Sequence, residues 1–259
     1  TVAREFDLSS VVALRDADLC FAHVCDTHVT DEGSARILAE ATEAINALGP
    51  DFVVFGGDLA NHGDAGSYRH LRAAIGALQS PAYHVVGNHD FLGSKTLFAA
   101  SLGPLNAAFD HAGYHVIILD STGPSTLTWE GLFTGEAVVW LEEHLAGVPV
   151  SRPLLLFTHH GIWSPDEHDP RRNLLWDVLN WKPVHRALEG RNLVLACAGH
   201  AHENHEARRG DTTFLWTAAL STNRANHGDE PPGFRIVWLR GRQVQTCWVP
   251  WVETEGTGQ

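Results

Sequence analysis

The stretch YHVVGNHDFLG, residues Tyr83 to Gly93, carries the pattern from which the fold of this chain can be inferred. An apolar run ends there in a glycine, an amide, an imidazole and a carboxylate. A solvated loop could explain any one of these side chains, because Asn and Asp favour turns for local hydrogen-bonding reasons. The pattern becomes informative when other apolar runs of the chain end in the same way.

Four other apolar runs also end in residues of the types that bind metal ions. The five clusters are Asp26 and His28 after LCFAHVC, Asp58 after FVVFGG, Asn88, His89 and Asp90 after YHVVG, His159 and His160 after LLLFT, and His200 and His202 after LVLACAG. Ligands of α/β sheets bind at the carboxyl ends of strands, so these clusters are expected to converge on one edge. Glycines directly before Asp58, Asn88 and His200 are expected to let the backbone turn sharply and approach bound ions closely.

Apolar runs alternate with helical patterns over most of the chain. Strands are expected at 19–28, 51–58, 82–90, 114–121, 152–160 and 193–202, and helices at 34–48, 67–78, 135–147 and 182–190. This alternation implies parallel strands with both faces of the sheet covered. The last part of the chain differs, because the strand-like runs 212–220, 234–240 and 243–249 have no helix between them and imply hairpins.

Length and composition predict one large domain spanning residues 1–259, with a core over about 19–250 and a flexible polar tail at 253–259. The 31 acidic and 18 basic residues give a formal charge of −13, which argues against a nucleic-acid footprint or an anionic membrane surface as partner. No segment approaches the roughly 18 apolar residues of a membrane span. The four cysteines lack Cys-x-x-Cys spacing and are expected to be reduced and structural.

The cellular location is inferred from the start of the chain. The chain starts at Thr1 and contains no methionine, so its natural start has been cut, processed or left out. A cytoplasmic location is favoured slightly, and export after removal of a signal peptide stays open. The sequence does not indicate an oligomeric state.

Converging carboxylates would repel one another, and converging neutral imidazoles would gain little from meeting. A divalent metal ion removes both difficulties, because it accepts carboxylate oxygen and imidazole nitrogen together. Seven candidate ligands are too many for one tetrahedral ion but suit two ions that share a bridging carboxylate. Oxygen and nitrogen ligands without thiolate suit manganese, iron or zinc, and the sequence does not choose among these metals.

The ordered set Asp-x-His, Gly-Asp, Gly-Asn-His-Asp, His and Gly-His-x-His resembles the calcineurin-like metallophosphoesterase superfamily, over Cys20 to about Gly241. Its spacing and short loops are most similar to the branch that contains class III cyclic-nucleotide phosphodiesterases and glycerophosphodiesterases. The resemblance implies an α/β fold, a four-layer α/β/β/α sandwich with a dinuclear metal site between the sheets at the C-terminal ends of the strands.

The resemblance also implies a role for each matching residue. The implied ligands are Asp26, His28 and His202 for the first metal, Asn88, His159 and His200 for the second, and Asp58 as the bridge. The implied catalytic pair is His89 as the phosphate-facing acid and Asp90 as the residue that orients it. Of the two adjacent histidines, the family pattern selects His159 over His160 as the ligand.

Two departures from the family pattern leave every ligand in place. Asn61 stands where the family often has an acidic residue, three places after the bridging aspartate, and Gly161 replaces a proline expected two places after the metal-binding histidine. Both bear on the shape of the loops that would contact substrate.

The segment 161–182 is longer than an ordinary connection and is expected to border the site. Its tryptophans could stack on a base or on an aromatic leaving group and its arginines could steer an anion, or they could anchor the loop and pair with acids; they are Trp163, Trp176, Trp181, Arg171 and Arg172. Outside this segment, His62, His160 and His227 are candidates to support the ligands from behind, and each is expected to be a polar rim residue without a catalytic role.

The expected activity is hydrolysis of a small phosphoester, with a diester preferred, by a metal-bound hydroxide with His89 as acid. No nucleophilic motif of the Gly-x-Ser-x-Gly kind is present. A phosphomonoesterase on the same metal core is the first alternative. A non-catalytic binding scaffold is the second, although such a protein would be expected to have lost ligands that are all present here.

Overall fold

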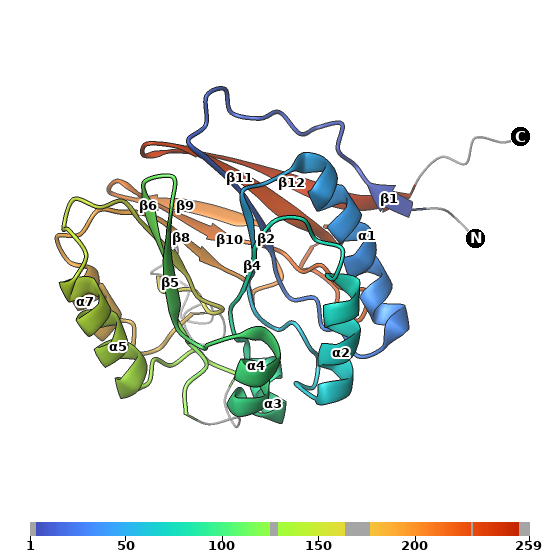
Figure 1. Cartoon of the computed structure of the whole chain (residues 1–259), viewed down its shortest axis with the longest axis horizontal. Helices are drawn as coiled ribbons and strands as arrows, with labels where there is room; N and C mark the ends of the chain where they lie inside the picture. The colour runs from blue at the N-terminus through green and yellow to red at the C-terminus, as the bar shows by residue number, and fades with distance from the viewer. Residues whose placement is uncertain (1–3, 125–128, 164–176, 229, 254–259) are drawn as a thin grey trace, which may run out of the picture.

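Two six-stranded sheets stack face to face and carry helices on their outer faces (Figure 1). The computed structural model describes residues 4–124, 129–163, 177–228 and 230–253. The strand orders are β1-β12-β11-β2-β3-β4 and β5-β6-β7-β8-β10-β9. The mixed α/β sandwich expected from the sequence is therefore confirmed.

The first sheet and the helices that cover it come mainly from the first hundred residues and the C-terminal hairpin. Its strands are β1 (Arg4–Phe6), β2 (Leu19–Val24), β3 (Phe52–Phe55), β4 (Ala82–His84), β11 (Gly233–Arg240) and β12 (Gln243–Glu253). Its helices are α1 (Glu32–Leu48), α2 (Ala65–Ala74), α3 (Asn88–Gly93) and α4 (Lys95–Leu102). β2, β3 and β4 run parallel, so their carboxyl ends lie at one edge.

Helix α1 illustrates how local sequence sets the boundaries. Asp31 accepts a hydrogen bond from the Ser34 backbone N–H at 2.8 Å, and the Ser34 side chain reaches back to the Asp31 N–H, which closes a capping box. The helix ends at Gly49, whose φ of 61° favours glycine.

The second sheet contains the middle of the chain. Its strands are β5 (Ala107–His111), β6 (Tyr114–Ile118), β7 (Leu154–Phe157), β8 (Leu193–Ala198), β9 (His205–Arg209) and β10 (Thr212–Trp216), and its helices are α5 (Gly135–Ala146) and α7 (Lys182–Leu188). β6, β7, β8 and β10 are parallel neighbours. Their carboxyl ends therefore also share one edge.

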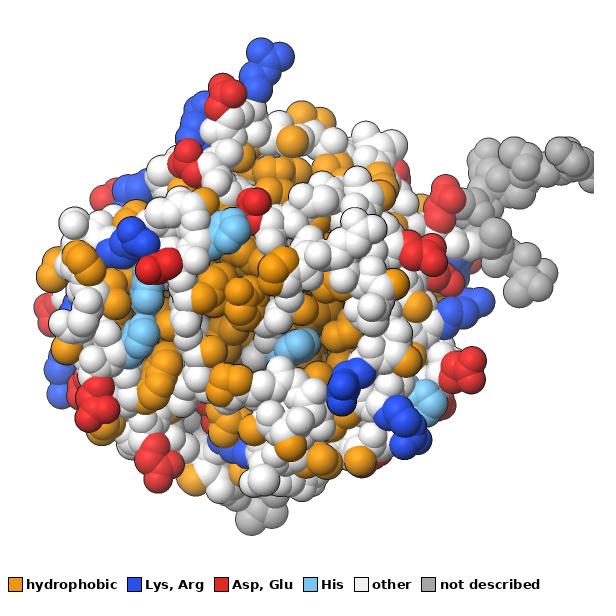
Figure 2. Space-filling model, in the orientation of Figure 1, with side chains coloured by type: hydrophobic (Ala, Val, Ile, Leu, Met, Phe, Trp, Pro, Cys, Tyr) orange, Lys and Arg blue, Asp and Glu red, His pale blue; other side chains and the backbone are white. Residues whose placement is uncertain are grey.

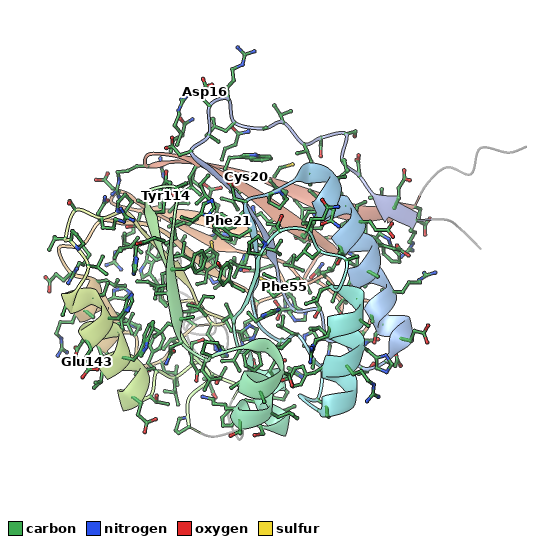
Figure 3. All side chains as sticks on the ribbon, viewed as in Figure 1. Asp16, Cys20, Phe21, Phe55, Tyr114 and Glu143 are labelled. Carbon is green, nitrogen blue, oxygen red and sulfur yellow. The ribbon has the colours of Figure 1, made fainter. Side chains whose placement is uncertain are left out.

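Three apolar layers hold the sandwich together, one under each helical layer and one between the sheets. Phe21 of the first sheet and Phe157 of the second meet edge to face at 5.3 Å in the middle layer. Figure 3 shows Phe21 and Tyr114 between the sheets and Phe55 toward helix α2, whereas Glu143 lies on the outer side of α5. Successive side chains of a strand point to opposite faces, so each strand contributes to the layer between the sheets and to the layer under its helices.

The edge strands β4 and β5 meet on the face drawn in Figures 1 and 2. Hydrophobic side chains gather at the centre of this face and charged ones lie around its periphery (Figure 2). The Tyr83 and Phe109 rings stack there at 3.8 Å, which joins the two sheets at their edges.

The structure adds elements and changes one pairing. The strands β1, β5 and β9 and the helices α3 and α4 were not expected, and the Gly-Asn-His-Asp stretch begins helix α3 instead of continuing a strand. The hairpin prediction holds for β11 and β12. β10 also lies in a hairpin, with β9, but in the other sheet, where its second neighbour is the parallel strand β8. The expected tail lies outside the described residues except for Glu253, which ends β12.

All four cysteines are free. Within the described ranges, no helix combines the length and the apolar character that crossing a membrane requires.

Candidate metal centre

Parallel strands bring the five clusters to one place where the two sheets end. The loops after β2 and β3 continue the parallel pairing, since the N–H of Asp26 donates to the Gly57 carbonyl at 3.0 Å and that of His28 to the Asp58 carbonyl at 2.9 Å. In the second sheet, the Gly199 N–H donates to the His159 carbonyl at 3.0 Å. Backbone pairing therefore fixes the side chains in register.

One group of possible ligands consists of Asp26, His28 and His202, whose nearest ligand atoms all lie within 4.8 Å of one another. The Nε2 atoms of His28 and His202 face each other at 3.2 Å, and His202 Nε2 lies 3.4 Å from Asp26 Oδ1. Asp26 and His28 are buried, and His202 is partly exposed.

A second group surrounds His159. Its Nε2 lies 3.1 Å from Asn88 Oδ1 and 3.3 Å from Asp58 Oδ1, and its ring centroid lies 5.0 Å from that of His200. The other Asp58 oxygen, Oδ2, lies 3.8 Å from His28 Nε2. The Asp58 carboxylate therefore stands between the two groups, with one oxygen toward each.

The residues present fit metal ions. Asp26 Oδ1 is buried without a hydrogen-bond partner, although burying a carboxylate oxygen is costly unless a cation or donor compensates. Two imidazole nitrogens converge on the same space beside it. Carboxylate, amide and imidazole donors without thiolate form a set that suits manganese, iron or zinc.

The electrostatics of Asp58 favour positive charge between the groups. Burial alone would raise the pKa of Asp58, but the imidazoles of His159, His28 and His89 outweigh burial and hold it well below its ordinary range. Burial alone would likewise lower the pKa of His159, but the Asp58 carboxylate outweighs it and raises that pKa to about 9. A buried, ionised carboxylate at this point attracts a cation, which can be imidazolium or metal.

Backbone strain is concentrated in the candidate ligands. Left-handed φ values occur at Asp26 (54°), His28 (44°), Asp58 (52°), His200 (63°) and His202 (49°). This conformation costs a non-glycine residue about 1 kcal/mol, although Asp and His tolerate it better than branched residues. Strain of this kind persists where the surrounding structure over-determines it, which is typical of functional sites.

Of the three glycines before the ligands, only one turns the chain as expected. Gly57 has a φ of 96° and turns the chain as expected, whereas Gly87 and Gly199 have ordinary φ values. A Cβ on Gly87 would collide with the Asp58 backbone and carboxylate, and one on Gly199 would lie 2.6 Å from Asp26 Oδ2. These two glycines are needed for close approach between loops and not for a turn.

His89 lies beside Asp58 with its ring in a defined orientation. Its backbone N–H donates to Asp58 Oδ1 at 2.8 Å, its Nδ1 lies 2.9 Å from the Asn61 carbonyl oxygen, and its Nε2 lies 4.0 Å from Asp58 Oδ2. The resemblance gives Asp90 the role of orienting this ring, and the group that faces His89 Nδ1 in the structure is the Asn61 carbonyl, in the loop after β3.

Asp90 has a structural environment of its own. Its carboxylate accepts the backbone N–H groups of Leu59, Ala60 and Gly87 at 3.1, 2.9 and 3.0 Å. Burial and the nearby Asp58 charge raise the pKa of Asp90 to about 7 in spite of these bonds. Asp90 therefore holds the loop that carries Asn61, whose carbonyl faces His89 Nδ1.

His160 is buried beside His200, with ring centroids 4.3 Å apart, but both of its ring nitrogens have protein partners. Nδ1 lies 3.0 Å from Ser121 Oγ, and Nε2 lies 3.2 Å from the Trp129 carbonyl oxygen. Burial and the neighbouring imidazoles of His200 and His159 hold the pKa of His160 well below its usual value. A neutral His160 with both nitrogens engaged fits a supporting residue better than a ligand.

A cavity of about 350 Å³ opens over these groups. Its lining includes six of the predicted site residues and four others; the others are Trp129, Arg224, Ala225 and His227, of which only His227 was a candidate from the sequence. Arg224 follows β10, and its Nη2 donates to Asn61 Oδ1 at 3.3 Å. A parallel β10 ends at the same edge as β8, so its polar loop reaches the site.

The expected loop 161–182 is described only at its ends. The Trp163 ring packs against Phe214 at 5.0 Å and the Trp181 ring against His185 at 4.5 Å, so these two tryptophans contact the second sheet and α7. Trp176, Arg171 and Arg172 lie outside the described residues. Exposed His62 lies 3.1 Å from the Asn61 side-chain nitrogen.

A sequence model of the family described as "Calcineurin-like phosphoesterase" matches residues 20–204. A probable cyclic nucleotide phosphodiesterase of Synechococcus is 27% identical over 255 residues, which cover 92% of this chain and 94% of that protein. A cAMP/cGMP dual specificity phosphodiesterase of Mycobacterium tuberculosis is 29% identical, over 71% of this chain and 62% of that protein. A glycerophosphodiester phosphodiesterase of Enterobacter lignolyticus is 28% identical, over 55% of this chain and 56% of that protein.

Solved structures share the fold at low sequence identity. A dimetal phosphatase from Danio rerio superposes with a TM-score of 0.72 at 16% identity, covering 92% of this chain and 98% of that one. A purple acid phosphatase from yellow lupin seeds superposes with a TM-score of 0.65 at 14% identity, covering 88% of this chain and 51% of that one. The sandwich described above is therefore the fold of metal-dependent phosphatases.

Proposed function

This chain belongs to the calcineurin-like phosphoesterase family, a family of metal-dependent phosphoester hydrolases, and from that premise we propose that it hydrolyses phosphodiesters with two bound transition-metal ions. The observation that carries the proposal is the position of Asp58, whose two carboxylate oxygens each face one group of ligand atoms. The His89 ring lies beside the same carboxylate. A carboxylate placed to bridge two ions, with an acid next to it, suits metal-assisted hydrolysis of a phosphoester.

In this proposal each metal has three ligands of its own in addition to the shared Asp58. They are Asp26, His28 and His202 for one ion and Asn88, His159 and His200 for the other. Bound ions of this kind lower the pKa of water and neutralise charge on phosphoryl oxygens. The neutral Asn88 amide leaves its ion with more Lewis acidity than a carboxylate ligand would.

The protein's own contribution to the leaving step comes from His89. The Asn61 carbonyl that faces its Nδ1 can only accept, so Nδ1 carries a proton. Nε2, which faces the cavity, is then the atom that gains and releases the second proton. In the imidazolium form, His89 donates from Nε2 to the leaving oxygen of the ester.

A diester is preferred over a monoester because the curated relatives that match most of this chain are named as phosphodiesterases. A phosphomonoesterase would use the same ligands and is the second candidate. A non-catalytic scaffold is disfavoured, because every ligand position and the proposed acid are filled.

The test is metal analysis followed by a substrate panel. The protein should bind two ions per chain and should cleave bis(p-nitrophenyl) phosphate faster than p-nitrophenyl phosphate. Cyclic nucleotides and glycerophosphodiesters extend the panel to alkoxide leaving groups. A preference for the monoester would favour the second candidate, and absence of all phosphoesterase activity in a protein loaded with two ions would overturn both.

A further inference from the structure

We propose that Trp129 forms a stacking surface for a planar aromatic group of the substrate, held in place by His160 and Ser121. The inference rests on the proposed function and goes beyond it by naming the part of the substrate that the site recognises. It concerns residues that the metal chemistry does not use. Of the tryptophans that the sequence offered either for stacking or for anchoring their loop, Trp163 and Trp181 pack elsewhere and Trp176 lies outside the described residues.

Trp129 is unusual in its exposure and its position. Trp129 lines the cavity and is 57% exposed. Among the large hydrophobic residues that are exposed in the described part of the chain, it is the aromatic one. Its ring centroid lies 5.3 Å from that of His89, with the planes tilted by 52°. A planar group that enters the cavity beside this indole would remove part of the ring from solvent.

The position of Trp129 is fixed by a chain of hydrogen bonds that begins in the sheet. The Trp129 carbonyl can only accept, so His160 Nε2, 3.2 Å away, carries the proton and donates to it. His160 Nδ1 is then an acceptor, and Ser121 Oγ donates to it at 3.0 Å. The Ser121 oxygen in turn accepts the His160 backbone N–H at 3.1 Å.

This chain of bonds uses buried groups to hold an exposed ring. Ser121 follows β6 and His160 follows β7, and both are buried completely. The buried pair therefore fixes the backbone of Trp129, whose indole faces the cavity next to the proposed acid. An aromatic side chain on an anchored backbone has only two torsions left to order, which suits it to stacking.

The neighbourhood of His89 defines where the planar group lies. His89 Nε2 donates to the leaving oxygen in the proposed function, so Trp129 flanks the leaving-group side of the ester. Stacking of a base on an aromatic side chain is sequence-tolerant and changes binding by about 10-fold or more. A diester carrying a base or aryl group would use Trp129, whereas a glycerol ester would not.

The experiment compares two diesters that differ only in the planar group: adenosine 3′,5′-cyclic phosphate and ribose 3′,5′-cyclic phosphate without the base. In Trp129→Ala, kcat/KM for the base-bearing ester should fall about 10-fold or more, mainly through KM, while the value for the abasic ester stays within about 2-fold. Trp129→Phe should retain most of the preference. Val150→Ala, an exposed apolar change in another loop, is the matched control.

His160→Ala tests the positioning role. It should lower the preference for the base-bearing ester while the protein keeps two ions per chain, because His160 acts through Trp129. Equal loss on both esters in Trp129→Ala, or no loss on either, would overturn the proposal. Loss of a metal ion in His160→Ala would overturn the role given to His160.

A binding measurement separates this inference from the proposed function. Titration calorimetry of the metal-loaded protein should show tighter binding of adenosine 5′-monophosphate than of ribose 5-phosphate, and Trp129→Ala should remove the difference. If the wild type cleaves no diester but shows this Trp129-dependent difference, the proposed function fails and the stacking surface stands. If diesters are cleaved and the two ligands bind equally, the stacking surface fails and the proposed function stands.

Discussion

A substitution at His89 can distinguish proton transfer from metal binding. The His89 ring faces the cavity, while its backbone N–H donates to Asp58. His89→Ala keeps that backbone bond and should retain both ions. Turnover should fall by roughly 10²–10⁴-fold, the usual contribution of a positioned acid. The fall should be largest for alkoxide leaving groups, which need a proton, and smallest for nitrophenolate, as measured with a leaving-group series.

Two results would change this assignment. Loss of a metal ion in His89→Ala, measured by metal analysis, would show that His89 is a ligand. Equal slowing of good and poor leaving groups with both ions retained would point to stabilisation of charge on the phosphoryl oxygens.

His84, at the end of β4, should make stability depend on pH. Burial lowers the pKa of His84 to about 4, its ring stacks on Phe55 at 5.3 Å, and its Nε2 is shielded without a hydrogen-bond partner. The pKa of His84 in the folded protein lies below its unfolded value of about 6.5. The contribution of neutral His84 to folding stability is therefore fully present above pH 6.5 and is lost as pH falls toward 4. The ring is half-buried, so the loss between pH 7 and 5 should be about 1 kcal/mol after solvent screening.

The comparison is with His84→Phe, which keeps the ring stacking and removes the titration. Denaturant unfolding at pH 7 and pH 5 should show a stability loss about 1 kcal/mol larger in the wild type than in the variant. The same loss in both proteins would show that His84 is solvated when protonated.

The candidate ligands could be predicted at the residue scale, because carboxylates and imidazoles rarely follow five strands of one chain unless they bind something together. The residues around them could not. The Nδ1 partner of His89 is a backbone carbonyl, that of Asn61, and a carbonyl has no signature in sequence. Trp129 and Ser121 come together with His160 through three separate loops, and only Ser121 had a signal, as it follows the strand at 114–118.

At the scale of elements, the loops after β3 and β4 are so close that only glycine fits at position 87. Gly87→Ala would force a Cβ into the Asp58 backbone and carboxylate, and its φ is ordinary, so the effect is steric and not conformational. Metal content per chain should fall below two and the melting temperature of the metal-loaded protein should drop. Gly135→Ala at the start of α5 is the control, because a Cβ there meets no atom within 4 Å.

Retention of two ions and of the melting temperature in Gly87→Ala would mean that the two loops can separate without cost. A loss of stability in Gly135→Ala of the same size would show that the effect is not specific to the ligand loops.

Elements with strong periodicity could be predicted, and three of the four edge strands, β1, β5 and β9, could not. The fully buried strands β3 and β7 carry the continuous apolar runs FVVF and LLLF, which burial on both faces requires. The edge strands β1 (REF) and β9 (HEARR) are short and polar, because they face solvent and are supported by one neighbour. Arg224 was not singled out from the sequence, because its loop reaches the site through the parallel pairing of β10 with β8, which the strand-like pattern does not indicate.

At the scale of the molecule, the candidate ligands come from both sheets. Asp26, Asp58 and Asn88 follow strands of the first sheet, and His159 and His200 follow strands of the second. The sandwich packing could be inferred from the resemblance alone, since no pattern in the sequence says which strands belong to which sheet. Bound ions would therefore join the two halves of the fold.

Removal of the ions should then lower the stability of the whole sandwich. One ion present at about 100 times its dissociation constant stabilises the folded state by about 2.7 kcal/mol, which for a chain of this length corresponds to about 5 °C in melting temperature. Treatment with a chelator, with removal verified by metal analysis, should lower the melting temperature by about this amount or more, and adding the metal back should restore it. Asp58→Ala is the control, because loss of the ligand between the two groups should lower metal content and leave little further response to chelator. An unchanged melting temperature after verified removal from the wild type would show that ion binding is not coupled to the folding of the two sheets, whereas a full chelator response in Asp58→Ala would show that the ions are held without this carboxylate.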